Sequence, residues 1–500
     1  MPSFCSLSFS SDYSSSCGSL EPSTPPLKAI PGPFWARFTS LWYFNRVRKG
    51  RFEYENIDLH RQYGPIVRVA PNQYSINDVS AIKIVYGAGT QFAKSAWYDG
   101  WKNPAQWTVF SDRDIKRHAD TRKRFTSLYS MSSLVHYEPF VDHCADLFIQ
   151  RLTEFADQNQ TFNLGHWFQC YAFDVIGNIT FGDRFGFLDR GDDIDGAIAA
   201  VHKVMMYSTL VGIYPEWHPR LFGLLGKLKS SGAAGRAYIT KFVQEKIRLE
   251  EKKRSDAKVV VAEKGQMQNF LEKMMLARDK DPEKVTDYHL LIMGQSNVTA
   301  GSDTTAISLS SIMWYLLQNP ETLCKLRAEI DEFTAQGRCS ANVTFKESQD
   351  MPYFQAVMKE ALRMHSATGL PMWRVVPAGG AQISGEFFPA GTIVGANTWV
   401  AHYDERIFPN ANVFKPERWI EAENHPEQLK EMNQMYMPFG LGSRTCLGKH
   451  ISILEMSKLI PRLVRDFNFT PLRKTWQTAN YWFVKPTDFE VQVKERQNKA

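Results

Sequence analysis

One cysteine lies in a glycine-rich segment directly before a helical pattern, and this arrangement restricts the fold more than any other feature of the chain. The segment runs from Phe439 to Gly448 and contains Cys446. Apolar residues at helical spacing follow from Ile453 to Phe467, so we expect the thiol near a positive helix end, where it ionises readily. Glycines leave backbone N–H groups free to point at a sulfur and let a flat cofactor approach closely. The pattern predicts that Cys446 is an iron ligand.

This segment resembles the haem-binding loop of the cytochrome P-450 family. It matches F-x-x-G-x-R-x-C-x-G at every defined position, and the likeness to fungal, pisatin-demethylase-like monooxygenases extends over residues 31–495. The resemblance implies haem b with Cys446 as its axial thiolate ligand, and Phe439, Gly440 and Gly448 beside it. The residues alone leave open a buried free cysteine in a loop.

Length and periodicity favour one large, mainly helical domain. The chain has 500 residues, of which 43% are hydrophobic, and no linker or repeat divides it after residue 33. We expect a disordered Ser/Pro-rich N-terminus without a transmembrane anchor (1–30) and a single haem-thiolate monooxygenase domain (31–500). Helical spacing dominates residues 114–335, and strand-like pieces occur at Trp373–Val376 and Tyr481–Val484, so minor β-sheets are expected. The resemblance implies the cytochrome P-450 fold, with a long central helix over the haem and the cysteine loop beneath it.

Charge and cysteine content exclude some classes of protein. A net charge of +6 is too mild and too dispersed for a nucleic-acid-binding protein, but it is compatible with an acidic protein partner. Seven scattered cysteines without a C-x-x-C pair indicate a reducing compartment. The resemblance implies electrons from NADPH through NADPH-cytochrome P-450 reductase, with cytochrome b5 as a second candidate donor, at the cytoplasmic side of the endoplasmic reticulum.

The N-terminal residues bear on attachment to a membrane. Residues 1–26 hold no apolar stretch long enough to span a bilayer. The protein is therefore expected to be soluble or peripherally attached, or an upstream exon is missing from this version of the sequence. Aromatic residues between Phe34 and Phe44 fit a peripheral membrane contact and packing on the domain equally well.

A long helix is predicted from Thr286, a good N-cap, to Gln318, where Asn319 and Pro320 supply a stop signal. At the standard rise it would be about 50 Å long. Its middle contains the run Ala300-Gly301-Ser302-Asp303-Thr304-Thr305, which has poor helix propensity.

This run is the predicted site of oxygen chemistry. Small residues at Ala300 and Gly301 would let the helix pass close to a planar ring. The Thr304 hydroxyl can bond a backbone carbonyl and open a groove for water, and Asp303 beside it can relay protons. The pair resembles the acid and alcohol of the family, whereas a polar interruption that faces solvent is the alternative reading.

Two further sets of charged residues fit the family pattern. Glu360 and Arg363 lie three apart on one predicted helix, and Arg418 follows in the segment Pro416–Trp419. This trio resembles the structural lock of the family, although a surface ion pair is the simpler reading. Haem carries two propionates, and the resemblance assigns their binding to His118 and Arg122, four residues apart, and to Arg374 and Arg444.

Aromatic residues favour an apolar or aromatic small-molecule substrate. Two groups match pocket-lining segments of the family, namely Trp97, Tyr98, Trp101 and Trp107, and Tyr481, Trp482 and Phe483. The resemblance implies an oxidoreductase that acts on paired donors and incorporates molecular oxygen, in fungal secondary-metabolite biosynthesis or in the detoxification of plant defence compounds. A haem-thiolate isomerase or dehydratase, and a non-catalytic haem sensor, are the rival classes, but neither needs Asp303 and Thr304.

Overall fold

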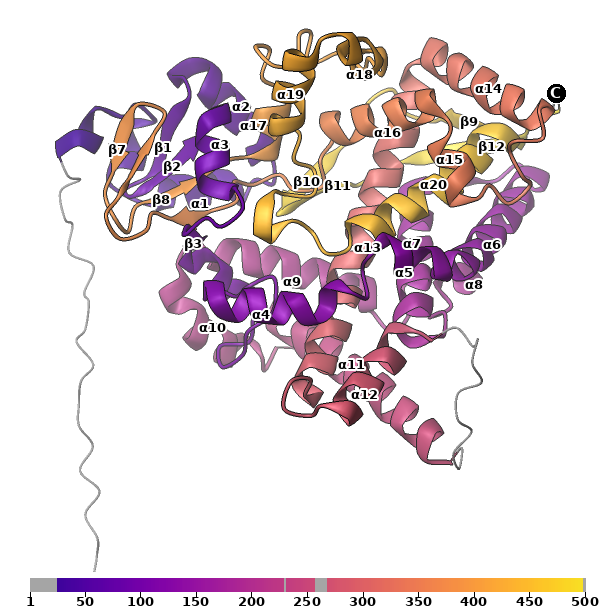
Figure 1. Ribbon diagram of the computed structural model, residues 1–500, viewed down its shortest axis with the longest axis horizontal. Helices are drawn as coiled ribbons and strands as arrows, with labels where there is room; N and C mark the ends of the chain where they lie inside the picture. Colours follow the sequence, from indigo (N-terminus) through magenta and orange to yellow (C-terminus); the bar gives the residue numbers. More distant parts are fainter. Residues whose placement is uncertain (1–24, 229–230, 257–267, 498–500) are drawn as a thin grey trace, which may run out of the picture.

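The computed structural model describes residues 25–228, 231–256 and 268–497. These residues form a mainly helical fold with small β-sheets, as expected (Figure 1). Of the N-terminal segment that the sequence predicts to be disordered, residues 1–24 lie outside the described part. Its last residues are ordered, because Pro25–Ala29 form the 3-10 helix η1 and the side chains of Leu27 and Ile30 are buried.

Twelve strands form four sheets in the described residues. The largest has the order β1-β2-β8-β5-β3, and it joins strands from both ends of the chain at one side of the molecule (Figure 1). Only β2 and β8 pair in parallel; the other pairs are antiparallel. The strand bounds are β1 Ile66–Ala70, β2 Gln73–Ile76, β3 Ala93–Lys94, β4 Thr161–Asn163, β5 Arg374–Val375, β6 Ala381–Ile383, β7 Glu386–Phe388, β8 Ile393–Gly395, β9 Phe467–Pro471, β10 Thr478–Tyr481, β11 Phe483–Pro486 and β12 Glu490–Glu495.

Helices make up most of the remaining structure. The first ten α-helices are α1 Leu41–Val47, α2 Phe52–Tyr63, α3 Val79–Tyr86, α4 Ile115–Thr126, α5 Met131–Leu134, α6 Glu138–Asp157, α7 Leu164–Phe181, α8 Phe187–Arg190, α9 Ala197–Val211 and α10 His218–Leu225. The next ten are α11 Gly232–Asp256, α12 Phe270–Lys280, α13 Asp287–Gln318, α14 Pro320–Ala335, α15 Phe345–Gln349, α16 Pro352–Met364, α17 Thr398–His402, α18 Glu417–Glu421, α19 Pro426–Met435 and α20 Lys449–Asp466. Short 3-10 helices are η2 Phe34–Arg37, η3 Ala96–Trp101, η4 Val135–Tyr137, η5 Pro215–Trp217, η6 Ala422–Asn424 and η7 Gly442–Arg444.

Helix α13 is the central element, and its predicted bounds are confirmed. The backbone N–H of Thr286 donates to Nδ1 of His289, which closes the first turn. At the other end the Asn319 side chain donates to the carbonyl of Tyr315 at 2.8 Å, and Pro320 begins the next helix. Helix α13 packs against α7, α11, α16 and α20, so its middle lies inside the largest hydrophobic cluster.

The strand predicted at Tyr481–Val484 is a hairpin turn. Tyr481 ends β10 and Phe483 begins β11, and Trp482 between them has a φ of 78°. The alternating apolar residues favoured one strand, but a left-handed residue reverses the chain here. The turn places Trp482, which is only 5% exposed, against Trp97 and Trp101.

The length and hydropathy of the helices bear on whether one of them could span a membrane. Among the residues that the structure describes, no single helix is long and apolar enough to cross a bilayer. One pair, Ala197–Val211 with Pro215–Leu225, is long and apolar enough only when taken together, and the two helices are bent by 120°.

Candidate functional site

The cysteine loop precedes α20, as the sequence predicts. The backbone N–H of Cys446 donates to the carbonyl of Phe439 at 2.8 Å, and this bond closes the loop, with Gly440 inside it and Gly448 as the N-cap of α20. Gly442 serves packing instead of a cofactor. Its φ is 60°, and a Cβ there would collide with the carbonyl oxygen of Tyr86 at the end of α3.

The thiol of Cys446 does not ionise as readily as its position suggested. Desolvation by the surrounding protein raises the pKa of Cys446 above its usual value, although the residue keeps exposed surface. The backbone N–H groups of Gly448 and Lys449 and the charge of Arg122 act in the opposite direction and lower this pKa. The helix end therefore favours a thiolate, but it does not outweigh burial, and a bound metal would supply the missing stabilisation.

Two polar residues in the middle of α13 take different partners. The Thr304 hydroxyl donates to the carbonyl of Ala300 at 2.7 Å, as predicted. The Asp303 carboxylate is buried and accepts from the Gln169 amide of α7 and from Lys485 of β11. In the described residues no hydrogen bond joins Asp303 to Thr304. Helix α13 continues through this run without a break. The backbone therefore gives no sign of the expected groove for water, which stays a prediction.

The two small residues before this pair have different neighbours. Ala300 lines a cavity beside α13. Gly301 faces α7, and a Cβ at this position would lie 2.9 Å from Cγ1 of Ile176. The lack of a side chain at Gly301 is thus needed for close helix packing, and its role beside a planar ring stays a prediction.

Cations gather where the five-stranded sheet meets α4 and the cysteine loop. Lys94 on β3 and Arg374 on β5 are direct partners in an antiparallel register, a like-charge pairing that ordinarily destabilises a sheet. Both residues are buried, with exposures of 5% and 3%. The charges of Arg374 and Arg444 add to burial and hold the pKa of Lys94 well below its usual value. Sequence reasoning missed Lys94, because no local pattern reveals this pairing.

Arg444 and Arg122 extend this cationic cluster. The Nη1 atom of Arg444 donates to the carbonyl of Asp112 at 2.7 Å, but its Nη2 is buried without a partner. Burial and the neighbouring Arg374 lower the pKa of Arg444 to about 10. The charge of Arg122 reaches the Cys446 sulfur. A buried excess of positive charge with an unused N–H donor fits a ligand that carries two carboxylates, such as haem.

His118 is a neutral member of the same group. Burial, followed by the charges of Arg444 and Lys94, lowers its pKa to about 3. The assignment of His118 to a haem propionate stays a prediction. A neutral imidazole can still donate one N–H to a carboxylate.

Glu360 forms a dense network with the two predicted arginines. Its side chain is fully buried and accepts from Arg363 at 2.8 and 2.9 Å and from Arg418 at 2.9 Å. The Trp419 indole N–H at 2.9 Å and the Lys415 backbone N–H at 3.1 Å complete its bonding. The trio thus links α16 to α18 and to the segment before α18, and the alternative of a surface ion pair is excluded.

A cavity of about 130 Å³ lies against α13. Its lining includes Ala300 and Thr299 of α13, and Trp101, Trp482 and Phe483 from the predicted aromatic segments. Other predicted aromatics lie elsewhere: Trp97 and Tyr98 belong to the buried core, Trp107 lines a different cavity, and Tyr481 contacts His202 and donates to the carbonyl of Arg48. Periodicity cannot distinguish a core ring from a cavity ring, which explains this partial agreement.

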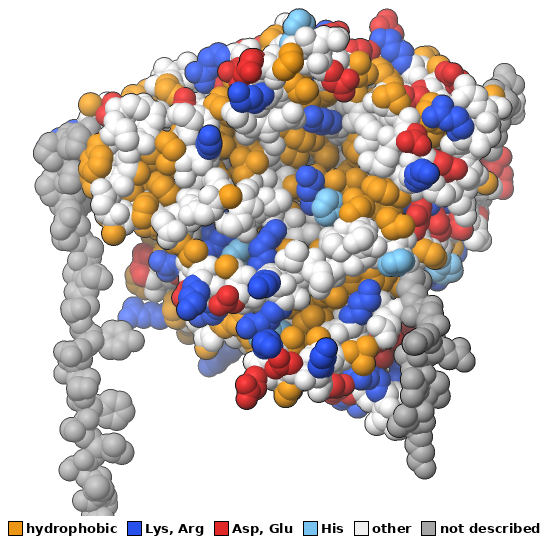
Figure 2. Space-filling model, in the orientation of Figure 1, with side chains coloured by type: hydrophobic (Ala, Val, Ile, Leu, Met, Phe, Trp, Pro, Cys, Tyr) orange, Lys and Arg blue, Asp and Glu red, His pale blue; other side chains and the backbone are white. Residues whose placement is uncertain are grey.

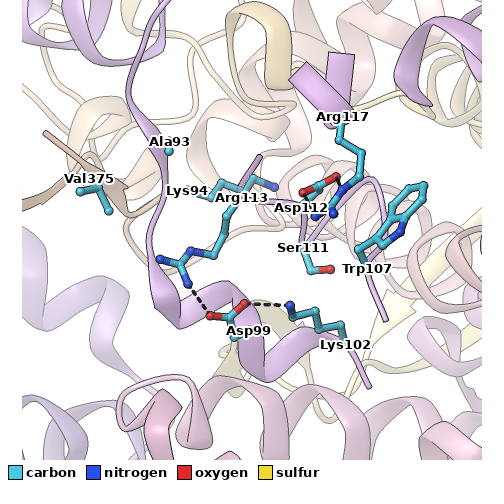
Figure 3. A pocket seen from close by; sticks show the side chains of 10 residues that line it. All are labelled: Ala93, Lys94, Asp99, Lys102, Trp107, Ser111, Asp112, Arg113, Arg117 and Val375. Carbon is cyan, nitrogen blue, oxygen red and sulfur yellow. Dashed lines mark hydrogen bonds and ion pairs between the residues drawn. The ribbon is translucent and has the colours of Figure 1, made fainter. Parts of the chain in front are cut away.

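A second cavity of about 340 Å³ is polar and contains no residue of α13 in its lining (Figure 3). Arg113 and Lys102 bind Asp99 from either side, at 2.7 and 3.1 Å. Arg117 binds Asp112 through two hydrogen bonds of 2.7 and 2.8 Å. Since its charges are largely paired, this cavity is not the place for an apolar substrate.

Comparison with known proteins bears on the whole chain. The family model for cytochrome P-450 matches residues 30–491. A pisatin demethylase from Fusarium vanettenii is 38% identical over 477 residues, which cover 94% of this chain and 89% of the relative. A cytochrome P-450 monooxygenase from Aspergillus terreus is 36% identical, with 89% and 91% covered, and the monooxygenase cicH from Emericella nidulans is 35% identical, with 94% of each covered. The chain therefore belongs to the cytochrome P-450 monooxygenase family.

Proposed function

We propose that this protein is a haem-thiolate monooxygenase that oxidises an apolar or aromatic small molecule with electrons from NADPH. One observation carries the proposal: the Cys446 loop, with two backbone N–H groups acting on its sulfur, lies within electrostatic reach of a buried cation cluster that lacks enough anions. A thiolate ligand and a cradle for two carboxylates are the two features that haem b needs from its protein.

The residues around haem would have separate tasks. Cys446 would bind the iron through its thiolate, shielded by Phe439, while Arg122, Arg374 and Arg444 would bind the propionates. Two further residues of the cluster would contribute, since Lys94 lies among these arginines and His118 can donate one N–H to a carboxylate. When bound, haem with a thiolate ligand supplies dioxygen activation and the transfer of an oxygen atom to substrate.

Thr304 and Asp303, both on α13, would hold and transfer protons. The Thr304 hydroxyl is anchored to the carbonyl of Ala300, next to the cavity, and can hold a proton there. Asp303 forms an ion pair with Lys485, and its carboxyl group would accept and return a proton. An isomerase or dehydratase would have no use for this pair, which favours the monooxygenase class.

The pathway is proposed from the relatives. Several of them are fungal monooxygenases, and we place this chain in fungal secondary-metabolite biosynthesis. The second candidate is demethylation or hydroxylation of a plant defence compound, which is favoured by the relative named for demethylating pisatin.

The surface over α4 supports an acidic electron donor. Figure 2 shows Lys and Arg side chains gathered over this helix, and Lys116 and Lys123 are among its exposed cations. NADPH-cytochrome P-450 reductase would dock here, with cytochrome b5 as a second donor, because complementary charge steers association.

An apolar surface supports peripheral contact with the endoplasmic reticulum from its cytoplasmic side. Phe34, Trp35 and Phe38 are 54–65% exposed around η2. Trp217 and Leu224 are 50% and 66% exposed near α10. The ring of Phe44 lies 6.0 Å from that of Tyr214, which connects these two parts of the surface. Exposed aromatic rings partition favourably into the headgroup region.

The test has two stages. The reduced, purified protein should give the long-wavelength carbon monoxide difference band of a thiolate ligand. With NADPH and a purified fungal reductase it should then consume dioxygen and convert a candidate metabolite to a product that is heavier by one oxygen atom or has lost a methyl group. A histidine-type band, or turnover that needs neither NADPH nor dioxygen, would refute the proposal.

A further inference from the structure

Two residues that line the cavity beside α13 each carry a buried N–H donor without a hydrogen-bond partner among the described residues. Arg236 of α11 lines it together with Ala300 and Phe483. The Nη2 atom of Arg236 donates to Ser208 at 2.7 Å and to the carbonyl of Gly100 at 3.3 Å, whereas its Nε is buried without a partner. A buried guanidinium N–H is costly to leave unpaired.

Trp101 provides a second unused donor in the same lining. The residue is only 7% exposed, and its indole N–H has no partner in the part of the chain that the structure describes. By contrast, the Gln295 amide, also in the lining, donates to the Thr240 hydroxyl at 2.7 Å. Unused donors therefore come from two separate elements, η3 and α11, and both line one cavity.

The charge of Arg236 is also unbalanced. Among the described residues no Asp or Glu forms an ion pair with it, and both of its acceptors are neutral. Burial lowers the pKa of Arg236 to about 10, which leaves it cationic at neutral pH. The other cation in the lining, Lys102, is already paired with Asp99 at 3.1 Å. Arg236 is thus the cation whose charge a ligand can balance.

A purely structural role explains only part of this geometry. Arg236 does tie α11 to Ser208 of α9 and to Gly100 of η3. Such a tie needs a hydrogen-bond donor but no charge, and it does not account for the unused N–H of Trp101. An anionic acceptor within the cavity would satisfy both residues at once.

We propose that the substrate carries a carboxylate, which Arg236 and Trp101 bind while the apolar part of the molecule contacts Ala300 and Phe483. This inference rests on the proposed function and narrows its substrate class to acids with an apolar or aromatic body. The size of the cavity favours a small ring, because about 150 Å³ holds one benzene molecule.

Calorimetric titration of the full-length, haem-loaded protein tests this inference without any need for turnover. The probes are benzoate, methyl benzoate and benzamide, which share one ring that the size of the cavity allows and differ in charge. We expect the acid to bind at least about tenfold more tightly than the ester or the amide, as a charged hydrogen bond implies. Equal affinities of the acid and either neutral probe would overturn the inference.

Variants identify the residue responsible. In Arg236→Gln the preference for the acid should disappear, Arg236→Lys should keep part of it, and Lys241→Gln, which removes an exposed charge from the same helix, should leave it unchanged. Equal weakening of acid and ester by Arg236→Gln would indicate a structural role and contradict the inference. If this variant fails to fold, the comparison of probes on the wild-type protein still decides. A normal thiolate band without a preference for the acid refutes the substrate class alone, whereas a missing band refutes the proposed function.

Discussion

The carboxylate of Asp303 on α13 and the ammonium group of Lys485 on β11 form an ion pair, with 3.2 Å between Oδ1 and Nζ. The Gln169 amide of α7 connects them, since it donates to Asp303 and accepts from Lys485 at 2.7 Å. Three elements distant in sequence thus fix one carboxylate. Thr304, the next residue, is held separately by the carbonyl of Ala300. Orientation of the acid therefore depends on β11 as well as on α13.

Replacing Lys485 by Met should reveal this dependence. The Asp303 side chain is 4% exposed and would lose its counter-ion, whereas Lys485 is 28% exposed and partly solvated. We expect a loss of about 2 kcal/mol in the free energy of unfolding, below the range for fully buried pairs. Product formed per NADPH should fall, and we expect the same fall in Asp303→Asn. Urea denaturation and coupling assays measure both effects, with Lys474→Met as an exposed control; unchanged coupling would separate Lys485 from proton transfer.

Thr304→Ala should leave the carbon monoxide spectrum intact and uncouple electron use from product formation. The hydroxyl that holds a proton near the cavity would be lost, so hydrogen peroxide should accumulate and product per NADPH should drop about tenfold or more. Ser310→Ala is the matched control, because this hydroxyl also bonds a carbonyl one turn back on α13, at 2.7 Å. Tight coupling in Thr304→Ala would show that its hydroxyl has no part in the relay.

Cys446→Ala should abolish the long-wavelength carbon monoxide band, since no other thiol would bind the iron. The exposed Cys324 on α14 offers a control with the same change of side chain. Difference spectra of the two reduced variants make the comparison. A thiolate-type band that persists in Cys446→Ala would mean that another residue is the ligand.

Glu360→Gln should destabilise the whole fold. The carboxylate compensates two buried arginines, Arg363 and Arg418, and loss of its charge leaves both poorly balanced. The expected cost is about 3 to 5 kcal/mol, typical of breaking a buried pair. Thermal unfolding and haem content report it, and Glu427→Gln, which breaks an exposed pair with Lys430, should cost less than about 1 kcal/mol. Similar losses in both variants would be inconsistent with this network.

The buried Glu53 should make stability depend on pH. Desolvation raises its pKa from 4.5 to about 7, against the opposing hydrogen bond from Asn480. The folded state therefore holds a proton that the unfolded chain releases, so the stabilising contribution is complete below pH 4.5 and is lost as pH rises through 7. Relative to Glu53→Gln, the wild-type protein should lose about 3 kcal/mol between these limits. Urea titrations at several pH values measure this, and Glu283→Gln, an exposed site, should not alter the profile.

Local signals explain which features could be read from the sequence. The bounds of α13 follow from Thr286 at one end and Asn319 with Pro320 at the other, all short-range determinants. The placement of Cys446 before α20 likewise needs only neighbouring residues. Lys94 was missed because its meaning arises from pairing with Arg374, far away in the sequence. Such pairings are invisible to periodicity.

Other residues have tertiary neighbours that the sequence did not reveal. Gly301 looked like a space for a cofactor, yet the packing of Ile176 on α7 requires its size. His118 was assigned to a propionate, and burial together with the charges of Arg444 and Lys94 lowers its pKa in the protein alone. Trp482 reverses the chain within a predicted strand, and its ring packs against Trp97, Tyr98 and Phe110. In each case the partner lies on another element, so the residue type alone did not determine its role.

The left-handed backbone of Trp482 has a consequence for directed evolution. The left-handed backbone conformation costs about 1 kcal/mol for a residue other than glycine. Replacing Trp482 by glycine would remove this backbone cost, although it would also remove the ring contacts. At this wall of the cavity, the relief of backbone strain in a glycine variant would therefore offset part of the stability lost with the indole ring. Position 482 is accordingly a position where a library that aims to admit bulkier molecules would lose little stability.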